Sequence, residues 1–288
     1  MGADRWQRLR CVVGSIAAGT LLAAPTSADG AASRARTLVA VGDIASCDVA
    51  EDEAVADLVA RTPGTLALLG DTVYDNGTLD EYLRCFLPRW GPFLPRTRAA
   101  LGNHEYANGA SDAADSKSVL GLPDDGWYSF ELGTWHVIVL NSNCEAVGGC
   151  NRDSRQWSWL RGDLARNRAT RCVLAYWHHP RFSSGQHGSD VRYAPFWDLL
   201  AAARADVVLS GHDHDYERFE PLKGIRSFVV GTGGRSQRPF GAARPRSVVR
   251  QTGTYGVLRL TLRPEGYSWA FLRASGEPFG DTGTGRCR

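Results

Sequence analysis

Short apolar runs rich in β-branched residues alternate along this chain with segments whose apolar positions recur at helical spacing. The runs "TLVAVGD" (37–43) and "TLALLGD" (65–71) predict buried strands. Between them, "EDEAVADLVAR" (51–61) begins with acidic residues and then places apolar residues at helical intervals, which predicts a helix. A second helix is expected over 78–87 and a third strand from Thr97 onward. This βαβα order indicates an α/β protein.

The second half of the chain begins with a similar pattern and ends in strands. "GWYSFEL" (126–132) and "TWHVIVLNSN" (134–143) predict a hairpin, and "SRQWSWLRGDLARN" (154–167) predicts a helix. Strands are then expected over 171–180 and 206–214, and three antiparallel strands over 225–234, 254–262 and 266–274. Two mixed β-sheets flanked by helices accommodate both halves. The expected fold class is therefore α/β, a four-layer αββα sandwich.

The N-terminal residues differ in character from the rest. Three arginines precede a short apolar run over 11–24, and small residues follow it. This order is typical of a secretory signal peptide cleaved after Ala28, and the run is short for a membrane span. We expect a signal peptide over 1–28, a linker over 29–36 and a single domain over 37–288, with a secreted mature protein. A retained membrane anchor is the alternative.

Composition narrows the class of protein. The 288 residues are 43% hydrophobic, and the formal net charge is only +2. Near-balanced charge argues against a nucleic-acid partner held by bulk electrostatics, and we expect no membrane association of the mature form. The cysteines that follow the expected signal peptide suggest disulfides in an exported protein. Their pairing is open, although Cys144 and Cys150 flank a flexible loop that allows a local bridge.

Five of the predicted strands end alike, with a glycine or an aromatic residue followed by a polar side chain. Sites in α/β proteins form beyond the carboxyl ends of strands, so we expect these ends to converge. The five pairs are Gly42-Asp43, Gly70-Asp71, Gly102-Asn103, Trp177-His178 and Gly211-His212.

The polar residues at these ends mix carboxylate, phenol, amide and imidazole groups. They are Asp43, Asp71, Tyr74, Asn103, His104, His178, His212 and His214. Each motif alone is commonly a polar turn, but their joint occurrence in this order favours a metal site. A carboxylate can bridge two cations, and imidazole suits transition metals. Two metals about 3.5–4 Å apart can hold both the attacking and the leaving oxygen of a phosphoryl displacement.

The series GD…GD…GNHE…HH…GHDH resembles the motif blocks of the metallophosphoesterase (calcineurin-like) superfamily and covers Val41 to His214. The strands that follow it are similar to those of the superfamily's second sheet. Most members have a histidine two residues after the first aspartate, where this chain has Ala45. The block "GDTVY" is instead similar to the GDxxY block of purple acid phosphatases, in which Tyr74 would be the additional ligand. "WHHP" and "GHDHDYER" also resemble that branch.

The resemblance implies two metal ions, each with its own ligand set. The first is expected to be Fe(III), with Asp71 as the bridging ligand, in a set of Asp43, Asp71, Tyr74 and His214. The second is expected to be divalent Fe, Zn or Mn, and its set is completed by Asn103, His178 and His212. We choose His178 over His179 because the family's ligand lies two residues before the proline.

Other residues are expected to act around the metals. His104 would supply a proton or positive charge to the leaving alkoxide. His187, in "SSGQHGSD", is a second catalytic candidate on the phosphate side, and its alternative is an exposed loop histidine. Glu105 and Asp213 are expected to orient their neighbours, and His136 to be structural.

Two further segments have open interpretations. "GTGGR" (231–235) predicts a strand-ending turn, and its alternative is a backbone approach to phosphate. The stretch 106–126 predicts a long loop directly after His104.

The expected function is that of a secreted di-metal phosphatase, which hydrolyses phosphomonoesters by attack of a metal-bound hydroxide. Its partner would be a small phosphorylated substrate. One alternative is a phosphodiesterase for nucleotides or lipid head groups that uses the same metals. The other is a non-enzymatic extracellular protein that binds metal or phosphate.

Overall fold

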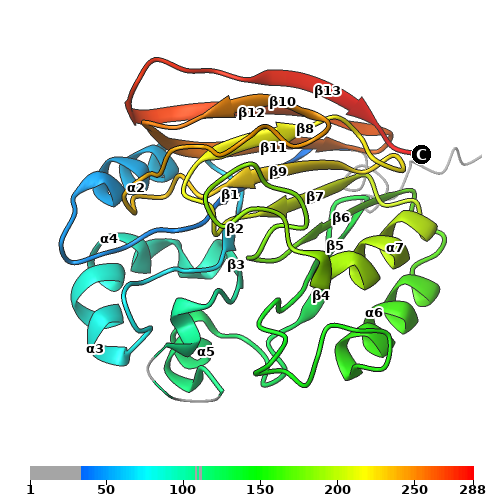
Figure 1. The fold of residues 1–288 in the computed structure, drawn as a ribbon, viewed down its shortest axis with the longest axis horizontal. Coiled ribbons are helices and arrows are strands. Elements are labelled where there is room, and N and C mark those ends of the chain that lie inside the picture. Colours follow the sequence, from blue (N-terminus) through cyan, green and yellow to red (C-terminus); the bar gives the residue numbers. More distant parts are fainter. Residues whose placement is uncertain (1–33, 108, 110–111) are drawn as a thin grey trace, which may run out of the picture.

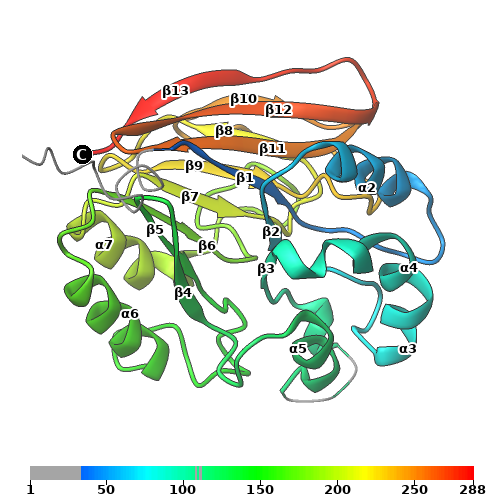
Figure 2. The ribbon, with the colours of Figure 1, turned by 180° about the vertical axis from the view of Figure 1, so that it is seen from behind.

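The computed structural model describes residues 34–107, 109 and 112–288, which form two β-sheets that face each other, with helices on both outer sides (Figure 1, Figure 2). Helices α2 to α5 cover the first sheet, and helices α6 and α7 cover the second. The expected four-layer αββα arrangement is confirmed. The expected signal peptide, 1–28, lies outside the described residues. Within the described part of the chain, no helix is long and apolar enough to cross a membrane.

The first sheet has the strand order β13-β12-β11-β1-β2-β3. Strands β1, β2 and β3 are parallel, and β11, β12 and β13 add to them in antiparallel fashion. The strand bounds are β1 Arg36–Val41, β2 Thr65–Leu69, β3 Thr97–Ala100, β11 Thr254–Arg263, β12 Gly266–Gly276 and β13 Thr282–Arg286. The helices on this side are α2 Glu51–Arg61, α3 Leu79–Glu81, α4 Leu87–Trp90 and α5 Ala114–Leu120, with a π-helical turn over Tyr82–Phe86 and a 3₁₀ turn over Gly91–Arg96.

The second sheet has the strand order β10-β8-β9-β7-β6-β5-β4. Strands β5, β6, β7 and β9 are parallel, while β4, β8 and β10 run antiparallel to their neighbours. The bounds are β4 Tyr128–Leu132, β5 Trp135–Val139, β6 Cys172–Tyr176, β7 Val207–Ser210, β8 Tyr216–Phe219, β9 Arg226–Val230 and β10 Ser247–Gln251. The helices are α6 Arg155–Arg166 and α7 Ala194–Ala202, and shorter 3₁₀ turns cover His104–Tyr106 and Val191–Tyr193.

The central strands are apolar throughout because each is buried on both faces. In β1, Leu38 and Ala40 face the second sheet, while Val39 and Val41 pack under helix α2. In β6, Leu174 packs in the core between the sheets, and Val173 packs on the side covered by helices. Because successive side chains of a strand point to opposite faces, each central strand contributes to the core between the sheets and to a second core under the helices on its outer side.

The carboxyl ends of the parallel strands meet at one edge of the sandwich. The backbone N–H of Gly42, after β1, donates to the carbonyl of Val230 at the end of β9, at 2.9 Å. The imidazole of His178, after β6, bonds through Nδ1 to the carbonyl of Leu69 at the end of β2, also at 2.9 Å. Each bond joins one sheet to the other, so side chains that follow strands of both sheets are brought to a common place.

Three sequence predictions about strand placement and connections are wrong. The segment 225–234 was expected to form an antiparallel set with the two later strands, but β9 lies in the second sheet, parallel to β7. Strands β11 and β12 return to the first sheet, next to β1, rather than continuing the second. The stretch 106–126 is not wholly a loop, because α5 forms within it and buries Leu120 against the first sheet.

Three disulfides join the cysteines of the domain. They are Cys47–Cys85, Cys144–Cys150 and Cys172–Cys287, with Cα–Cα distances of 5.0, 5.1 and 5.2 Å. The local bridge across the 144–150 loop is the one that the sequence allowed. The bridge from Cys172 closes the longest segment, 115 residues, and ties β6 of the second sheet to the C-terminal end beyond β13 of the first.

Removing the long bridge should destabilise the fold more than removing the short one. On the chain-entropy model, closing a loop of about 100 residues is worth up to about 4.7 kcal/mol, and closing a loop of six residues about 2 kcal/mol. We expect C172A/C287A to lower the denaturant midpoint clearly more than C144A/C150A, measured under oxidising conditions. Equal losses in the two variants would contradict this ranking.

Candidate metal centre

The backbone at the convergent edge is shaped to bring side chains close together. Asp43, Asp71 and His212 adopt left-handed conformations, with φ of 61°, 49° and 73°. Such conformations cost on the order of 1–3 kcal/mol each and are found mainly at functional sites. A side chain at Gly102 would overlap the carboxylate of Asp71, and a Cβ at Gly211 would lie 2.6 Å from Asp43 Oδ2. The glycines before the polar residues are therefore required by close approach.

One group of donors surrounds the phenol of Tyr74. Its hydroxyl lies 3.0 Å from Asp43 Oδ1, 3.2 Å from Asp71 Oδ2 and 3.3 Å from His214 Nε2. His214 Nε2 is in turn 3.5 Å from Asp43 Oδ1. These four residues are the set expected for the first metal, and the structure brings all of them together.

A second group surrounds the imidazole of His178. Its Nε2 lies 3.2 Å from Asn103 Oδ1, 3.2 Å from His212 Nδ1 and 3.2 Å from Asp71 Oδ2. Asp71 Oδ2 is thus within 3.2 Å of donors from both groups. The structure brings the residues expected for the second set together, and Asp71 lies between the two groups.

Hydrogen bonds on the far side of two rings fix which nitrogen faces the site. His178 Nδ1 lies 2.9 Å from the carbonyl of Leu69, and His214 Nδ1 lies 2.8 Å from the carbonyl of Ser236. A carbonyl only accepts, so each Nδ1 donates. In the neutral rings, Nε2 then presents a lone pair toward the cluster, as a metal ligand requires.

Burial shifts the pKa values of several groups in this cluster toward their neutral forms, whereas the contact between Asp71 and His178 lowers the pKa of Asp71 and raises that of His178 to about 9, against the effect of burial. Burial raises the pKa of Asp43 to about 8, and repulsion from Asp71 adds to the shift. Burial also raises the pKa of Tyr74 well above its usual value, and the two carboxylates add to that shift. Burial lowers the pKa of His214 to about 4, so its ring is neutral at ordinary pH.

A pair of cations fits this donor set. Multiply charged ions favour the anionic forms of carboxylate and phenol, which opposes the upward pKa shifts at Asp43 and Tyr74. Neutral imidazole is the form of histidine that binds metal. Oxygen, imidazole and amide donors lie at 3.0–3.5 Å from one another in two groups that share one carboxylate. This chemistry suits transition metals.

Two buried carboxylates hold the loops that carry these residues. Glu105 accepts bonds from the backbone N–H groups of Asp71, Thr72 and Gly102 at 3.0, 2.6 and 2.6 Å. Asp213 accepts from the N–H of His187 at 2.7 Å. Both therefore orient their neighbours, in line with the sequence expectation.

Histidines and arginines surround the cluster. His104 Nε2 lies 3.9 Å from Asp71 Oδ2, and its Nδ1 lies 2.6 Å from the carbonyl of Asp75. The His187 ring lies 4.3 Å from that of His212, between centroids, and its Nε2 accepts from Arg238 at 2.8 Å. Both catalytic candidates predicted from the sequence thus lie beside the expected ligands.

Sequence reasoning missed two arginines at this site. The guanidinium of Arg235 lies 4.6 Å above the Tyr74 ring and pairs with Asp75 at 2.8 Å, while Arg238 contacts His187. The signal was their position at the glycine-rich turn 231–235, since Arg235 ends this turn and Arg238 follows three residues later. That turn ends strand β9 as predicted, and its N–H groups bond to other backbone carbonyls: Gly233 donates to Gly42 and Arg235 to Asp43. These two amides are therefore not available to phosphate.

The remaining histidines of the described chain have structural partners. His179 Nδ1 lies 2.8 Å from the hydroxyl of Ser142, and burial lowers the pKa of His179 to about 3.

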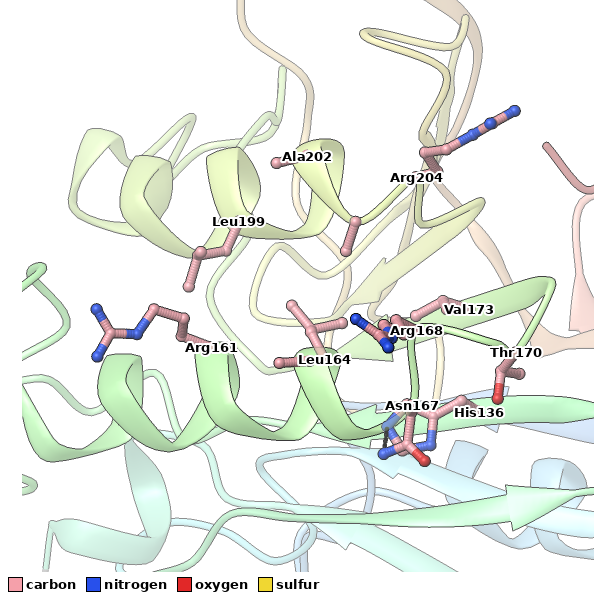
Figure 3. Close-up of a pocket in the computed structure, with 12 residues that line it drawn as sticks. His136, Arg161, Leu164, Asn167, Arg168, Thr170, Val173, Leu199, Ala202 and Arg204 are labelled. Atoms are coloured by element: carbon pink, nitrogen blue, oxygen red, sulfur yellow. Dashed lines mark hydrogen bonds between the residues drawn. The ribbon is translucent and has the colours of Figure 1, made fainter.

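His136 bonds to Glu131 and to Asp163 at 2.6 Å each. It borders a cavity of about 370 Å³ between α6 and α7 that none of the expected site residues lines (Figure 3). His136 is structural, as expected.

Comparison with known proteins identifies the class. The Calcineurin-like phosphoesterase family model matches residues 36–216, more than half of the chain. The chain belongs to this family of metal-dependent phosphoric ester hydrolases. Within the family, it is similar to purple acid phosphatases.

Two curated relatives, one from a plant and one from human, illustrate the similarity. The chain is 25% identical to purple acid phosphatase 15 of Arabidopsis thaliana over 232 residues, covering 65% of this chain and 43% of that protein. It is 29% identical to human acid phosphatase type 7 over 236 residues, covering 67% of this chain and 53% of that protein. The chain thus matches about half the length of these relatives.

Solved structures show the same fold. A purple acid phosphatase from yellow lupin seeds superposes with a TM-score of 0.75 at 18% identity, covering 87% of this chain and 54% of that one. GAP50, described as the anchor in the inner membrane complex of Plasmodium, superposes with a TM-score of 0.68 at 16% identity, covering 88% and 89%. At such identities the likeness concerns the fold alone.

Glu105 offers a test of how the bridging position is held. In Glu105→Gln, an amide NH₂ replaces one acceptor oxygen and faces backbone N–H donors, so at least one buried bond is lost. We expect the free energy of unfolding to fall by about 2 kcal/mol and the metal content to fall with it. Glu131→Gln, which removes a carboxylate that is bonded to His136 and lies away from the centre, is the control. Normal metal content and stability in Glu105→Gln would show that Asp71 does not depend on this carboxylate.

Proposed function

We propose that this protein is a di-metal phosphatase that hydrolyses phosphomonoesters at the cluster around Asp71. The observation that carries the proposal is the position of Asp71 Oδ2, within 3.2 Å of both Tyr74 OH and His178 Nε2. One carboxylate between two donor groups of different chemistry supports a bridged pair of unlike metals. Residues 1–28, read as a signal peptide, support secretion as part of the same proposal.

The first ligand set supports Fe(III). It offers two carboxylates and a phenol, whose three negative charges offset much of the charge of a trivalent ion with a divalent neighbour. The second set offers an amide, two imidazoles and the shared carboxylate, which suits divalent Fe, Zn or Mn. Once bound, such a pair supplies an activated water near neutral pH and positive charge that holds phosphate.

His104 is proposed to deliver the proton to the leaving alkoxide. Its Nδ1 is engaged with the carbonyl of Asp75, so Nε2 is the nitrogen directed to the centre. The side chain is 30% exposed and therefore accessible to a substrate bound over the cluster. A proton on Nε2 can then pass to an oxygen within hydrogen-bond reach.

His187 is proposed to position phosphate rather than to transfer a proton. Arg238 always carries its protons, so the 2.8 Å contact makes His187 Nε2 an acceptor and leaves the proton of the neutral ring on Nδ1. The ring can donate one hydrogen bond to a phosphate oxygen. Arg238 adds positive charge at the same edge.

The tyrosine ligand gives the sharpest test of the metal assignment. A phenolate bound to Fe(III) absorbs visible light by charge transfer. We expect this absorption to vanish in Tyr74→Phe and to fade in His214→Ala, because both residues belong to the first set. In His212→Ala, the colour should survive better while the divalent metal is lost first. Absorption spectra and metal analysis of the three purified variants measure this.

A colourless wild-type enzyme, fully active with divalent metals alone, would overturn the Fe(III) assignment and leave the broader phosphoesterase proposal intact. Absence of hydrolysis of any phosphate ester by the metal-loaded protein would overturn the proposed activity. Parallel assays on a phosphomonoester and a phosphodiester decide between the two enzymatic alternatives. Faster turnover of the diester would show that the protein is a phosphodiesterase rather than a phosphomonoesterase.

His104→Ala should retain metal and lose rate. A positioned general acid contributes roughly 10²–10⁴-fold, so turnover of an alkyl phosphate should fall by about that factor. Hydrolysis of p-nitrophenyl phosphate should fall much less, because its leaving group needs little protonation. Equal losses on both substrates would show that His104 does not act as the acid.

A further inference from the structure

The segment that leaves strand β9 concentrates positive charge beside the metal centre. Residues 235–250 contain no Asp or Glu but contain five arginines, Arg235, Arg238, Arg244, Arg246 and Arg250. Arg235 pairs with Asp75, whereas no carboxylate within the described residues forms an ion pair with the other four. In a chain whose net charge is only +2, this is a local excess of positive charge.

This arginine segment packs against the loop that carries His187. The N–H of Gly241 donates to the carbonyl of Ser184 at 2.8 Å, and the N–H of Arg244 donates to the hydroxyl of Ser184 at 2.9 Å. At its start, Arg238 contacts His187, whose ring lies 4.3 Å from that of His212. The arginines therefore begin at the metal centre and extend away from it.

A cavity of about 310 Å³ lies further along the arginine segment. Three arginines line it, Arg181, Arg244 and Arg246, together with the apolar side chains of Phe182 and Phe219. One acidic residue, Glu220, is also in its lining.

The cavity and the metal centre share one loop. Ser189 lines the cavity and is two residues from His187, a chain distance of at most about 7 Å. Arg244, which also lines the cavity, extends to this loop: its Nη2 would lie 3.5 Å from a Cβ at Gly188, the residue next to His187.

Guanidinium groups suit phosphate because they donate two parallel hydrogen bonds and remain charged. We propose that this cavity is a second anionic subsite, so that the preferred substrates carry two phosphates on a short carbon skeleton. One phosphate lies over the metal centre and the other between Arg244 and Arg246. Phe182 and Phe219 provide an apolar wall for the skeleton. This inference rests on the proposed function for the first phosphate only.

The test compares hexane-1,6-diol bisphosphate with hexyl phosphate, whose leaving groups are chemically alike. We expect wild-type kcat/KM to favour the bisphosphate roughly tenfold beyond the statistical factor of about two, as one added charge-assisted contact would give. In Arg244→Gln/Arg246→Gln, the ratio should fall to about the statistical factor. The control Arg259→Gln/Arg286→Gln removes the same charge from exposed positions of the first sheet and should keep the wild-type ratio.

Binding of hexane-1,6-bisphosphonate and hexylphosphonate, measured by calorimetry, tests the subsite without hydrolysis. We expect the bisphosphonate to bind about tenfold more tightly to the metal-loaded wild type, and the advantage to disappear in Arg244→Gln/Arg246→Gln. If the protein hydrolyses hexyl phosphate but shows no preference in either experiment, the subsite is wrong and the proposed function stands. If it binds the bisphosphonate through these arginines but hydrolyses nothing, the proposed function fails and the subsite stands. Equal loss in both double variants would show long-range attraction only and would overturn the subsite.

Discussion

The position of one carboxylate, that of Asp71, determines the arrangement of the whole centre. Its Oδ2 lies between the phenol of Tyr74 and the imidazole of His178, while its Oδ1 accepts the backbone N–H of His104 at 2.9 Å. Gly102 leaves room for it, and Glu105 holds the loop on which it sits. If this side chain moved, the two donor groups would no longer share an oxygen. The strand ends of both sheets are arranged around that requirement.

Burying so many polar groups at one edge opposes folding, and the rest of the structure offsets that cost. Like charges lie close together, and three residues have left-handed backbones. Bonds between the sheets, such as Gly42 to Val230, hold the strained edge in place, and three disulfides restrain the fold that carries it. Bound cations would contribute further, because ligands that bind only the folded state stabilise it. A rigid backbone around the site is therefore needed to keep these buried ionisable groups close together.

The sequence predicted those features that depend on local pattern. The helix over 51–61 and the apolar strands were readable from periodicity, and the Gly-Asp and Gly-His pairs marked the convergent ends. Which sheet β9 joins was not readable, because strand partners are set by contacts distant in the chain. Cysteine pairing was open for the same reason. Arg235 and Arg238 had only their position at the glycine-rich turn as a sequence signal, and their roles arise from tertiary contacts with Tyr74 and His187.

Fold likeness alone does not separate the enzymatic from the non-enzymatic interpretation, because both a purple acid phosphatase and the GAP50 anchor share the architecture. The separation depends on side chains. A structural polar turn would not need a phenol with three ionisable neighbours within 3.3 Å, nor two imidazoles held by carbonyls so that Nε2 faces inward. Buried groups without compensation destabilise a protein, so such a set persists where a cation completes it. His104, partly exposed and directed at the same point, adds a group that metal binding alone does not require. This combination favours an enzyme over a protein that only binds metal or phosphate.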